Sequence, residues 1–372
     1  MSEKILPLKY PPITTFTGYA AALAILFEHE ESHDWVFSHY LQVYAIDIIN
    51  RDESSYNDDY EYQLRVPFTA CFFGDFDTRR LANAIDEYFF LRREGCPYFD
   101  IFEMATEIID TYSNSFSSFI KTMIDLSMYV YTHLDVSQIK DYNFPVPFNH
   151  QVLIFGYDDE KKVIHYADFL NNQTRKYSFS TCSYEEIDRA YNGFKNLFVP
   201  PVKSVAAIRY NDFQGSYEYG YIRDTVREYI YPNPPKSEMF GEYFSTNYSW
   251  INWKAKIHMG VNVYDYLSDF FDAELQAGEK YIDYRLYHAM YDHKEMMLLR
   301  LNYLIKKGWL SGAKHDVVCK YSQVRNNMLI IRTLILKFNE NKKEELKSRV
   351  QLLLSETKRL EIELLKQIFD IE

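Results

Sequence analysis

A histidine and an aspartate in one short stretch of the chain could form the acid–base part of a catalytic site. The stretch FNHQVLIFGYDDEKKVIHYADF, residues 148–169, predicts two strands joined by a polar turn, with His150 opening the first strand and Asp168 closing the second. If the strands pair as a hairpin, the two side chains meet at its open end, where a carboxylate can hold an imidazole in a proton-accepting tautomer. The spacing is equally compatible with a His150 that only begins a strand and an Asp168 that faces water.

An element that carries a nucleophile would have to approach this hairpin. Residues 14–30, TTFTGYAAALAILFEHE, combine threonines that can cap a helix with a small and apolar run, which predicts a buried helix. In a papain-type site, the dipole of a helix stabilises a thiolate at its N-terminus, and an imidazole on a later strand exchanges the proton. A helix first and a sheet later is the order found here.

The remaining pattern predicts two domains. Residues 1–214 predict an α+β domain with helices packed on an antiparallel sheet, and residues 215–372 predict an all-α helical domain. Residues 34–48 fit a helix or an extended segment. Further helices are expected at 78–95, 96–112, 115–127, 183–194, 262–278, 282–308, 315–338 and 342–369, and strands at 63–74, 128–136, 151–158, 162–169, 174–181 and 203–211.

Composition excludes several classes of partner. The net charge of -12 argues against nucleic acid or an anionic membrane surface, because both require a positive face. No apolar run is long enough for a membrane span and the N-terminus lacks a signal pattern, so we expect a cytoplasmic protein. The four cysteines have no metal-ligand spacing, so we expect no metal, no cofactor and no disulfide framework.

Several segments resemble the butirosin biosynthesis protein H family. They are TGYAAALAIL, DWVFSHYLQVYA, GCPYFD, MYVYTHLDVSQI, HQVLIFGYDDEKKVIHYADF, VNVYDYLSDF and IDYRLYHAMYDHKEMMLLRLNYL. The resemblance implies a papain-like or C39-like cysteine peptidase fold associated with nonribosomal peptide and polyketide assembly lines. It implies transfer of an acyl or peptidyl group from a carrier-protein thioester to an amine. In that reaction His150 would be the general acid and base, and Asp168 would hold its tautomer.

The resemblance also implies a cysteine at the start of the first helix, and here the chain departs from the family. Matching the LAIL run places Gly18, or else Thr17, at the nucleophile position, and we expect the adjacent Tyr19 and Asn149 to contact the substrate. Three accounts stay open: a cleft that binds without turnover, a nucleophile substituted in an otherwise intact site, or attack by another residue. The Thr17 hydroxyl is one such residue, although it is a much weaker nucleophile than a thiolate.

The other thiols are weaker candidates. Cys96 precedes a predicted helix, which could lower its pKa, but we favour a buried structural cysteine there. The resemblance also places Cys96 outside the nucleophile position. Cys71 and Cys182 lie in strand-like surroundings and are expected to be inert.

The helical half contributes polar residues that could contact a substrate. Arg285, His288 and His293 lie in the segment DYRLYHAMYDHKEMMLLR, where His288 and Asp292 form an i,i+4 pair. His293 falls on the apolar stripe, for which a satisfied core histidine is the favoured interpretation. The charged segments KKEELKSRV and ETKRLEIELLK predict a solvated helix face. Their leucines could form a homodimer seam, although packing within the chain is favoured.

Three functions follow from these patterns. The first is an acyltransferase or amide-forming enzyme of a natural-product pathway, with a carrier protein and a small amine or peptide as partners. The second is a catalytically inactive homologue that acts as a binding or scaffold protein. The third is a peptidase with the same fold.

Overall fold

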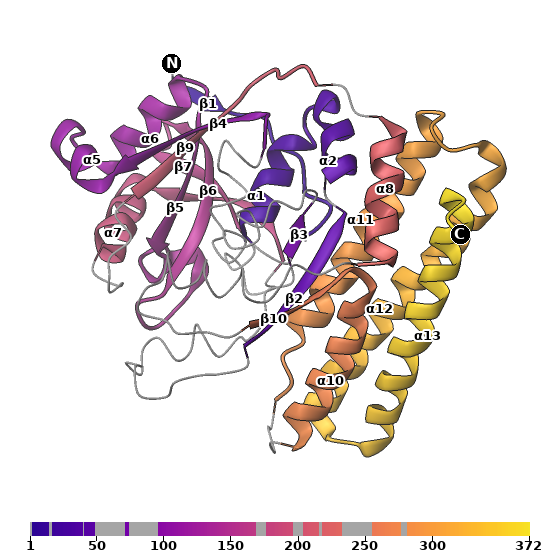
Figure 1. Cartoon of the computed structure of the whole chain (residues 1–372). Helices are drawn as coiled ribbons and strands as arrows, with labels where there is room; N and C mark the ends of the chain where they lie inside the picture. Colours follow the sequence, from indigo (N-terminus) through magenta and orange to yellow (C-terminus); the bar gives the residue numbers. More distant parts are fainter. Residues whose placement is uncertain are drawn as a thin grey trace. The chain divides into compact units, whose positions relative to one another are not determined.

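The computed structural model describes residues 2–14, 17–39, 41–48, 71–73, 96–168, 176–195, 204–215, 218–232, 255–276 and 281–372. They form a mixed α+β chain with an antiparallel sheet and a C-terminal helical region (Figure 1). The chain divides into two compact units. Unit 1 comprises Met1–His33 and Glu87–Gln214, and unit 2 comprises Asp34–Asp86 and Gly215–Glu372.

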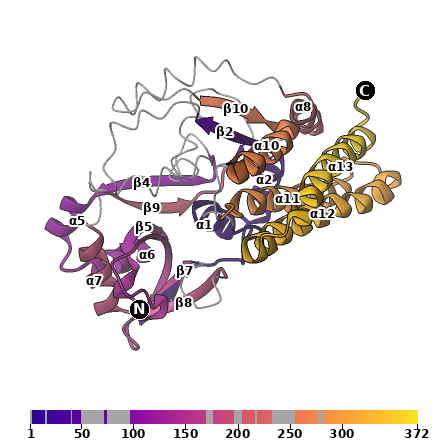
Figure 2. The same ribbon diagram turned by 90° about the horizontal axis from the view of Figure 1, so that it is seen from below.

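Unit 1 is built on an antiparallel sheet of seven strands. Six strands follow the order β4-β9-β5-β6-β7-β8, and β1 pairs with the end of β6. Figure 2 shows β4 and β9 side by side, as their pairing requires. The strands are β1 (Glu3–Ile5), β4 (Phe99–Ala105), β5 (Tyr129–Asp135), β6 (Asn149–Asp158), β7 (Val163–Asp168), β8 (Ser178–Ser183) and β9 (Ser204–Tyr210).

Helices cover both faces of this sheet. On one face, Tyr129 donates a hydrogen bond to the carbonyl of Pro7, in the segment that leads to the fully buried helix α1. On the other face, Tyr157 donates to Asp125 of α6. Figure 1 likewise shows α1 on one side of the sheet and α6 and α7 on the other. The helices of unit 1 are α1 (Thr17–Leu26), α5 (Thr106–Tyr112), α6 (Phe116–Asp125) and α7 (Tyr184–Phe194).

Local sequence explains where the two outer helices begin. Ser115 accepts a hydrogen bond from the Ser118 amide at the start of α6. Ser183 and Glu186 form a reciprocal capping box at the start of α7. Such caps satisfy amides that the first helical turn leaves without partners, so each serine fixes the point at which its helix starts.

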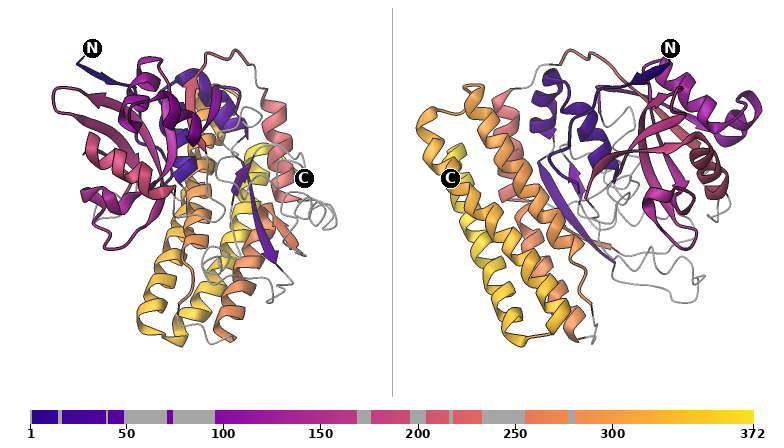
Figure 3. Two further views of the ribbon diagram at one scale, coloured as in Figure 1. Left: turned by 90° about the vertical axis from the view of Figure 1, so that its left-hand side faces the viewer. Right: turned by 180° about the vertical axis from the view of Figure 1, so that it is seen from behind.

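Unit 2 combines long helices with a small sheet of order β10-β2-β3. Helices α12 and α13 pack along each other, and both views of Figure 3 show them side by side in orange and yellow. The elements are α2 (His33–His39), β2 (Gln42–Ile48), β3 (Cys71–Phe73), α8 (Tyr219–Ile230), β10 (Ala255–Met259), α10 (Val263–Gln276), α11 (Arg285–Lys306), α12 (His315–Asn341) and α13 (Glu344–Phe369).

The two compact units differ in one respect from the predicted domains, which divide the chain at residue 214. The segment Asp34–Asp86 belongs with the helical unit, because β2 pairs with β10 and because Arg300 of α11 donates a hydrogen bond to the Phe37 carbonyl at 2.5 Å. These partners lie more than 200 residues apart along the chain, with a separation of 263 for Arg300 and Phe37. Local sequence patterns do not reveal such pairings.

Several predictions of elements can be compared with the structure. Strands β5, β6, β7 and β9 are confirmed within two residues of their predicted ends, and β8 begins four residues later than predicted. The helix predicted over 96–112 is wrong in its first part, because Phe99–Ala105 pairs with β9 as a strand. An all-α second domain is also wrong in one detail, since β10 is a strand. The predicted helix at 78–95 and most of the predicted strand at 63–74 lie outside the described residues.

One charged helix face is only partly solvated. Glu361, in the segment ETKRLEIELLK, is fully buried, as is Thr357 one turn earlier. Glu361 accepts hydrogen bonds from Tyr229, Tyr264 and Tyr321, which explains how a carboxylate is accommodated there. No helix in the described part of the chain is long and apolar enough to cross a membrane.

Candidate active site

His150 and Asp168 meet in unit 1, as the hairpin interpretation predicted. The Nδ1 atom of His150 lies 2.8 Å from Oδ2 of Asp168. The carboxylate is fully buried, whereas the His150 side chain is 15% exposed. With Nδ1–H donating to the carboxylate, Nε2 of a neutral ring carries the lone pair that can accept a proton. The pair therefore has the groups that a general base requires, and part of the His150 side chain is exposed to solvent.

A β-bulge places the two side chains on the same face of the sheet. The register between β6 and β7 shifts by one residue between Ile154 and Gly156. On the His150 side of this shift, Leu153 pairs with Ala167, so the next pair in register is Val152 with Asp168. Asp168 therefore lies on the same face of the sheet as Val152 and as His150, which is two residues from Val152 on the same strand. Without the shift, His150 and Asp168 would point to opposite faces. The bulge is thus a local feature on which the site depends.

Tyr142 is a third member of the site, and the sequence did not single it out. It lies in η6 (Lys140–Tyr142), a short turn after β5, and its hydroxyl donates to Oδ2 of Asp168 at 2.7 Å. Burial, and secondarily the charge of Asp168, raise the pKa of Tyr142 well above its usual value. The phenol is therefore a neutral donor, and the buried carboxylate has two hydrogen-bond partners on one oxygen.

The first turn of α1 points to the end of the sheet that carries His150. The far end of α1 lies near the first residue of β5, because the Lys9 amide donates to the Ala24 carbonyl and the nearby Pro7 carbonyl accepts from Tyr129. The segment before α1 also reaches the His150 end, where Tyr10 packs edge-on against Tyr177, the residue before β8. A helix of ten residues is about 15 Å long, so its two ends lie at different levels of the sheet.

Thr17, Gly18 and Tyr19 are buried in that first turn. Helix α1 packs against β6 and β7 from the face opposite to the one on which His150 and Asp168 lie. The two groups therefore approach the same end of the sheet from different sides. In the described part of the chain, no hydrogen bond joins the Thr17 hydroxyl to His150.

Asn149 belongs to a polar chain on the α1 face of the sheet. Its Nδ2 lies 3.1 Å from Nδ1 of His133, Nε2 of His133 lies 3.1 Å from Nε2 of Gln151, and Gln151 accepts a hydrogen bond from Tyr131. Burial, followed by the charge of His150, lowers the pKa of His133 to about 4. His133 is thus neutral near pH 7, and it was not identified from the sequence. Its position on a strand next to His150 was the available signal.

The cysteine side chains that the structure describes do not supply a thiolate to this site. Burial raises the pKa of both Cys96 and Cys182. Cys182 lies four residues along β8 from Ser178, the partner of Asp168, which corresponds to about 13 Å. Cys319 is exposed on α12 in unit 2. The side chain of Cys71 lies outside the described part.

The three substrate-contact candidates of the helical half belong to unit 2. Arg285 pairs with Asp283, with Nη2 and Oδ2 2.5 Å apart. Nδ1 of His288 lies 3.1 Å from Nη1 of Arg332 and 3.9 Å from Oδ1 of Asp292.

His293 is fully buried in the same helix. Its Nε2 lies 2.6 Å from the Leu41 carbonyl and its Nδ1 lies 3.0 Å from Nζ of Lys294. This arrangement agrees with the core interpretation of that residue.

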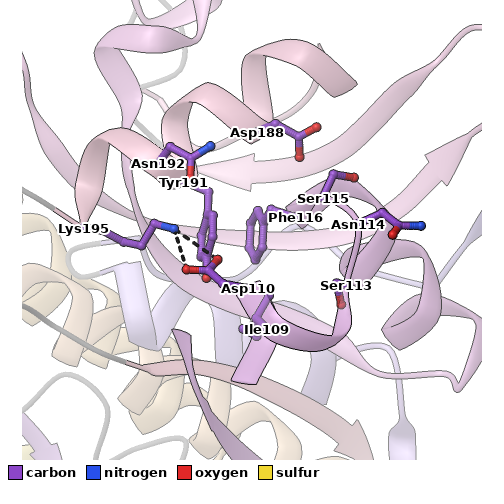
Figure 4. A pocket seen from close by; sticks show the side chains of 10 residues that line it. All are labelled: Ile109, Asp110, Ser113, Asn114, Ser115, Phe116, Asp188, Tyr191, Asn192 and Lys195. Atoms are coloured by element: carbon purple, nitrogen blue, oxygen red, sulfur yellow. Dashed lines mark hydrogen bonds and ion pairs between the residues drawn. The ribbon is translucent and has the colours of Figure 1, made fainter. Parts of the chain in front are cut away.

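A cavity of about 380 Å³ lies elsewhere in unit 1, among α5, α6 and α7 (Figure 4). Its charged side chains are already paired: Lys195 binds Asp110 at 2.9 Å, and Asp188 accepts hydrogen bonds from the amide and hydroxyl of Ser117. The rings of Phe116 and Tyr191 stack 4.1 Å apart in its wall. The residues that line it include neither His150 nor Asp168, so it is not part of this site.

The described residues contain no group of three or more metal-ligating side chains close enough to hold an ion. The chain matches no known protein-family model, and no curated protein matches it.

Proposed function

We propose that unit 1 is a papain-like domain of the butirosin biosynthesis protein H type that transfers an acyl group from a thioester to an amine. The observation that carries this proposal is the 2.8 Å contact between a fully buried Asp168 and a His150 ring that is 15% exposed. A buried carboxylate that orients an accessible imidazole is the arrangement required of a general base. A cytoplasmic natural-product pathway with a carrier protein as acyl donor fits this chemistry.

The reaction needs no enzyme thiol, because a thioester is already an activated acyl donor. The amine nitrogen attacks the thioester carbonyl carbon while Nε2 of His150 takes the proton that the nitrogen loses. Collapse of the tetrahedral intermediate breaks the carbon–sulfur bond, and His150 returns the proton to the leaving thiolate. Asp168 keeps the proton on Nδ1 throughout and stabilises the imidazolium. Gly18 or Thr17 at the start of α1 is compatible with this direct route.

A binding or scaffold protein is the second candidate, and one observation favours it. The position where the family resemblance implies a cysteine holds Gly18 or Thr17, and burial keeps Cys96 and Cys182 protonated. Peptide hydrolysis is less well supported, because a peptide bond is much less reactive than a thioester and depends more on a strong nucleophile.

An assay with a small thioester tests the proposal. The chain and the His150→Ala and Thr17→Ala variants are incubated with S-hexanoyl-N-acetylcysteamine and a panel of primary amines, and amides are quantified by mass spectrometry. We expect amide from the parent chain and from Thr17→Ala, and loss of product in His150→Ala. Equal rates in the parent and His150→Ala would contradict catalysis by this pair.

Intact-protein mass spectrometry distinguishes the direct route from a covalent one. The parent chain should carry no acyl adduct, whereas a Gly18→Cys variant should acquire one if the thioester reaches the start of α1. An adduct on the parent chain would show that Thr17 or a cysteine is the nucleophile. If neither protein reacts or forms amide, but the thioester binds, the binding function is the better account.

A further inference from the structure

Tyr142 is fixed beside the His150–Asp168 pair by its turn and by a neighbouring ring. The turn η6 is followed directly by Asn143, which has a left-handed conformation with φ of 53°. The Tyr142 ring stacks on Tyr166 of β7, with ring centres 5.8 Å apart and planes 14° from parallel. Tyr142 is only 6% exposed, so its hydroxyl has little access to water. The phenol is therefore held in place by packing as well as by its hydrogen bond.

The hydrogen bond of Tyr142 ends on the same atom as that of His150. Oδ2 of Asp168 lies 2.7 Å from the Tyr142 hydroxyl and 2.8 Å from Nδ1 of His150. A hydrogen bond donated to a carboxylate stabilises its negative charge and draws electron density from the shared oxygen. The oxygen then attracts the imidazolium proton less strongly.

We propose that Tyr142 is a positioning residue that sets the basicity of His150 through Asp168. This role rests on the proposed acyl transfer, in which His150 must give its proton back to the leaving thiolate. A carboxylate without the Tyr142 hydrogen bond would stabilise the imidazolium more and would slow that return. Tyr142 also fixes the direction of the Asp168 side chain, and through it the orientation of the ring.

The other titratable groups around the pair do not change their protonation near neutral pH, or their effect can be tested with a separate variant. Burial raises the pKa values of the Tyr166, Tyr177 and Cys182 side chains, and that of His133 is lowered to about 4. Asp141 carries a carboxylate near the pair, and it accepts hydrogen bonds from Tyr166 at 3.0 Å and Ser180 at 2.6 Å. Tyr166→Phe therefore removes an equivalent hydroxyl that bonds Asp141 instead of Asp168.

The test is an NMR pH titration of His150 in the full chain. Labelled histidine gives one signal for each of the ten histidines, and His150→Gln identifies the relevant one. We expect Tyr142→Phe to raise the pKa of His150 by about 0.5 to 1 unit, because the carboxylate loses a donor. Tyr166→Phe should shift it by less than about 0.2 unit. Equal shifts in the two variants, or none in Tyr142→Phe, would overturn the proposal.

A second pair of variants tests whether the effect of Tyr142 on the pKa of His150 depends on the Asp168 carboxylate. In an Asp168→Asn chain, adding Tyr142→Phe should leave the pKa of His150 unchanged, because the connecting charge is gone. A shift as large as in the parent background would show that Tyr142 acts by another path. Amide and thiol-release assays are not needed for either titration. Failure of the acyl-transfer proposal and failure of the Tyr142 proposal can therefore be told apart.

Discussion

Each unit of the molecule contains a completely buried carboxylate that accepts a hydrogen bond from tyrosine, one hydroxyl at Asp168 and three at Glu361, but the two sites differ in their basic partner. Asp168 in unit 1 binds His150, whose side chain is 15% exposed. Glu361 in unit 2 lies 2.9 Å from Nζ of Lys294, and both of these side chains are fully buried. We call the His150–Asp168 pair the open site, because its basic partner is partly exposed to solvent. We call the Lys294–Glu361 pair the closed site, because its basic partner is fully buried.

The closed site connects five helices. Glu361 of α13 accepts hydrogen bonds from Tyr229 of α8, Tyr264 of α10 and Tyr321 of α12, and Lys294 of α11 donates to the Tyr229 hydroxyl at 2.6 Å. Burial raises the pKa of all three phenols well above the usual value, so they remain neutral donors. A network that is satisfied on every side specifies one packing of the bundle.

The difference gives a criterion for separating a pair that could exchange protons from a purely structural one. Burial of the carboxylate does not distinguish them, since it is complete in both. What differs is the exposure of the basic partner. The His150 side chain is 15% exposed, whereas Lys294 is enclosed by Glu361, Tyr229 and His293. The first site suits chemistry and the second suits stability.

Breaking the closed pair should have the largest effect. Glu361→Gln leaves the Lys294 ammonium buried without its counter-charge, and we expect unit 2 to lose about 3 to 5 kcal/mol of stability. All four tryptophans, Trp35, Trp250, Trp253 and Trp309, lie in the ranges of unit 2, so fluorescence during urea unfolding reports on it.

Glu363→Gln is the matched control for that variant, because this residue is exposed on the same helix. It should change stability by less than about 0.5 kcal/mol. Similar losses in the two variants would mean that the Lys294–Glu361 pair does not hold the bundle together.

A smaller effect on stability is expected from His133, the second histidine near the open site. His133 has a pKa of about 4 in the fold, against about 6.5 when unfolded, so the unfolded state binds more protons between these values. The stabilising contribution is present above pH 6.5 and is lost as the pH falls toward 4, amounting to on the order of 3 kcal/mol. His133→Gln should therefore flatten the acid dependence of stability, measured by hydrogen exchange in β5 and β6.

His165→Gln serves as its control. Burial also lowers the pKa of His165, but the ring lies elsewhere, on β7, and we expect a smaller change in the same pH window. If both variants leave the acid dependence as steep as in the parent chain, the burial of His133 does not contribute to it.

The smallest loss of stability is expected at the open site itself. Asp168→Asn keeps a carbonyl oxygen that can accept from Tyr142 and from Nδ1–H of a neutral His150. Because His150 can release its proton to water, no buried charge is left behind. We expect a loss of about 1 kcal/mol in unit 1, measured by hydrogen exchange of β6 amides. A loss as large as that of Glu361→Gln would remove the distinction between an open and a closed site.

The sequence predicted the open site because its residues are close in the chain. Alternation, a polar turn and the ends of two strands place His150 and Asp168 on paired strands, and the family resemblance favours their contact over a His150 that only begins a strand. The bulge near Gly156 could not be predicted from this pattern, although it decides which face Asp168 occupies. Tyr142 was missed because a residue in a short turn carries no periodic signal.

The closed site could not be recognised because its partners are distant. Glu361 stands in a mixed-charge helix whose pattern indicates a solvated face, and the tyrosines that accommodate it lie 40 to 132 residues away. In the same way, β10 has no local signal that identifies β2 as its partner. The pattern predicts Phe99–Ala105 as the start of a helix because the helical spacing of α5 follows it directly.

The most direct test of the account is the rate of amide formation from S-hexanoyl-N-acetylcysteamine by Asp168→Asn and Asp141→Asn. The two carboxylates lie in the same region, but only Asp168 contacts His150. We expect Asp168→Asn to lower the rate by about 100-fold or more, while Asp141→Asn stays within about threefold of the parent chain. Equal rates in all three proteins would contradict catalysis by the His150–Asp168 pair.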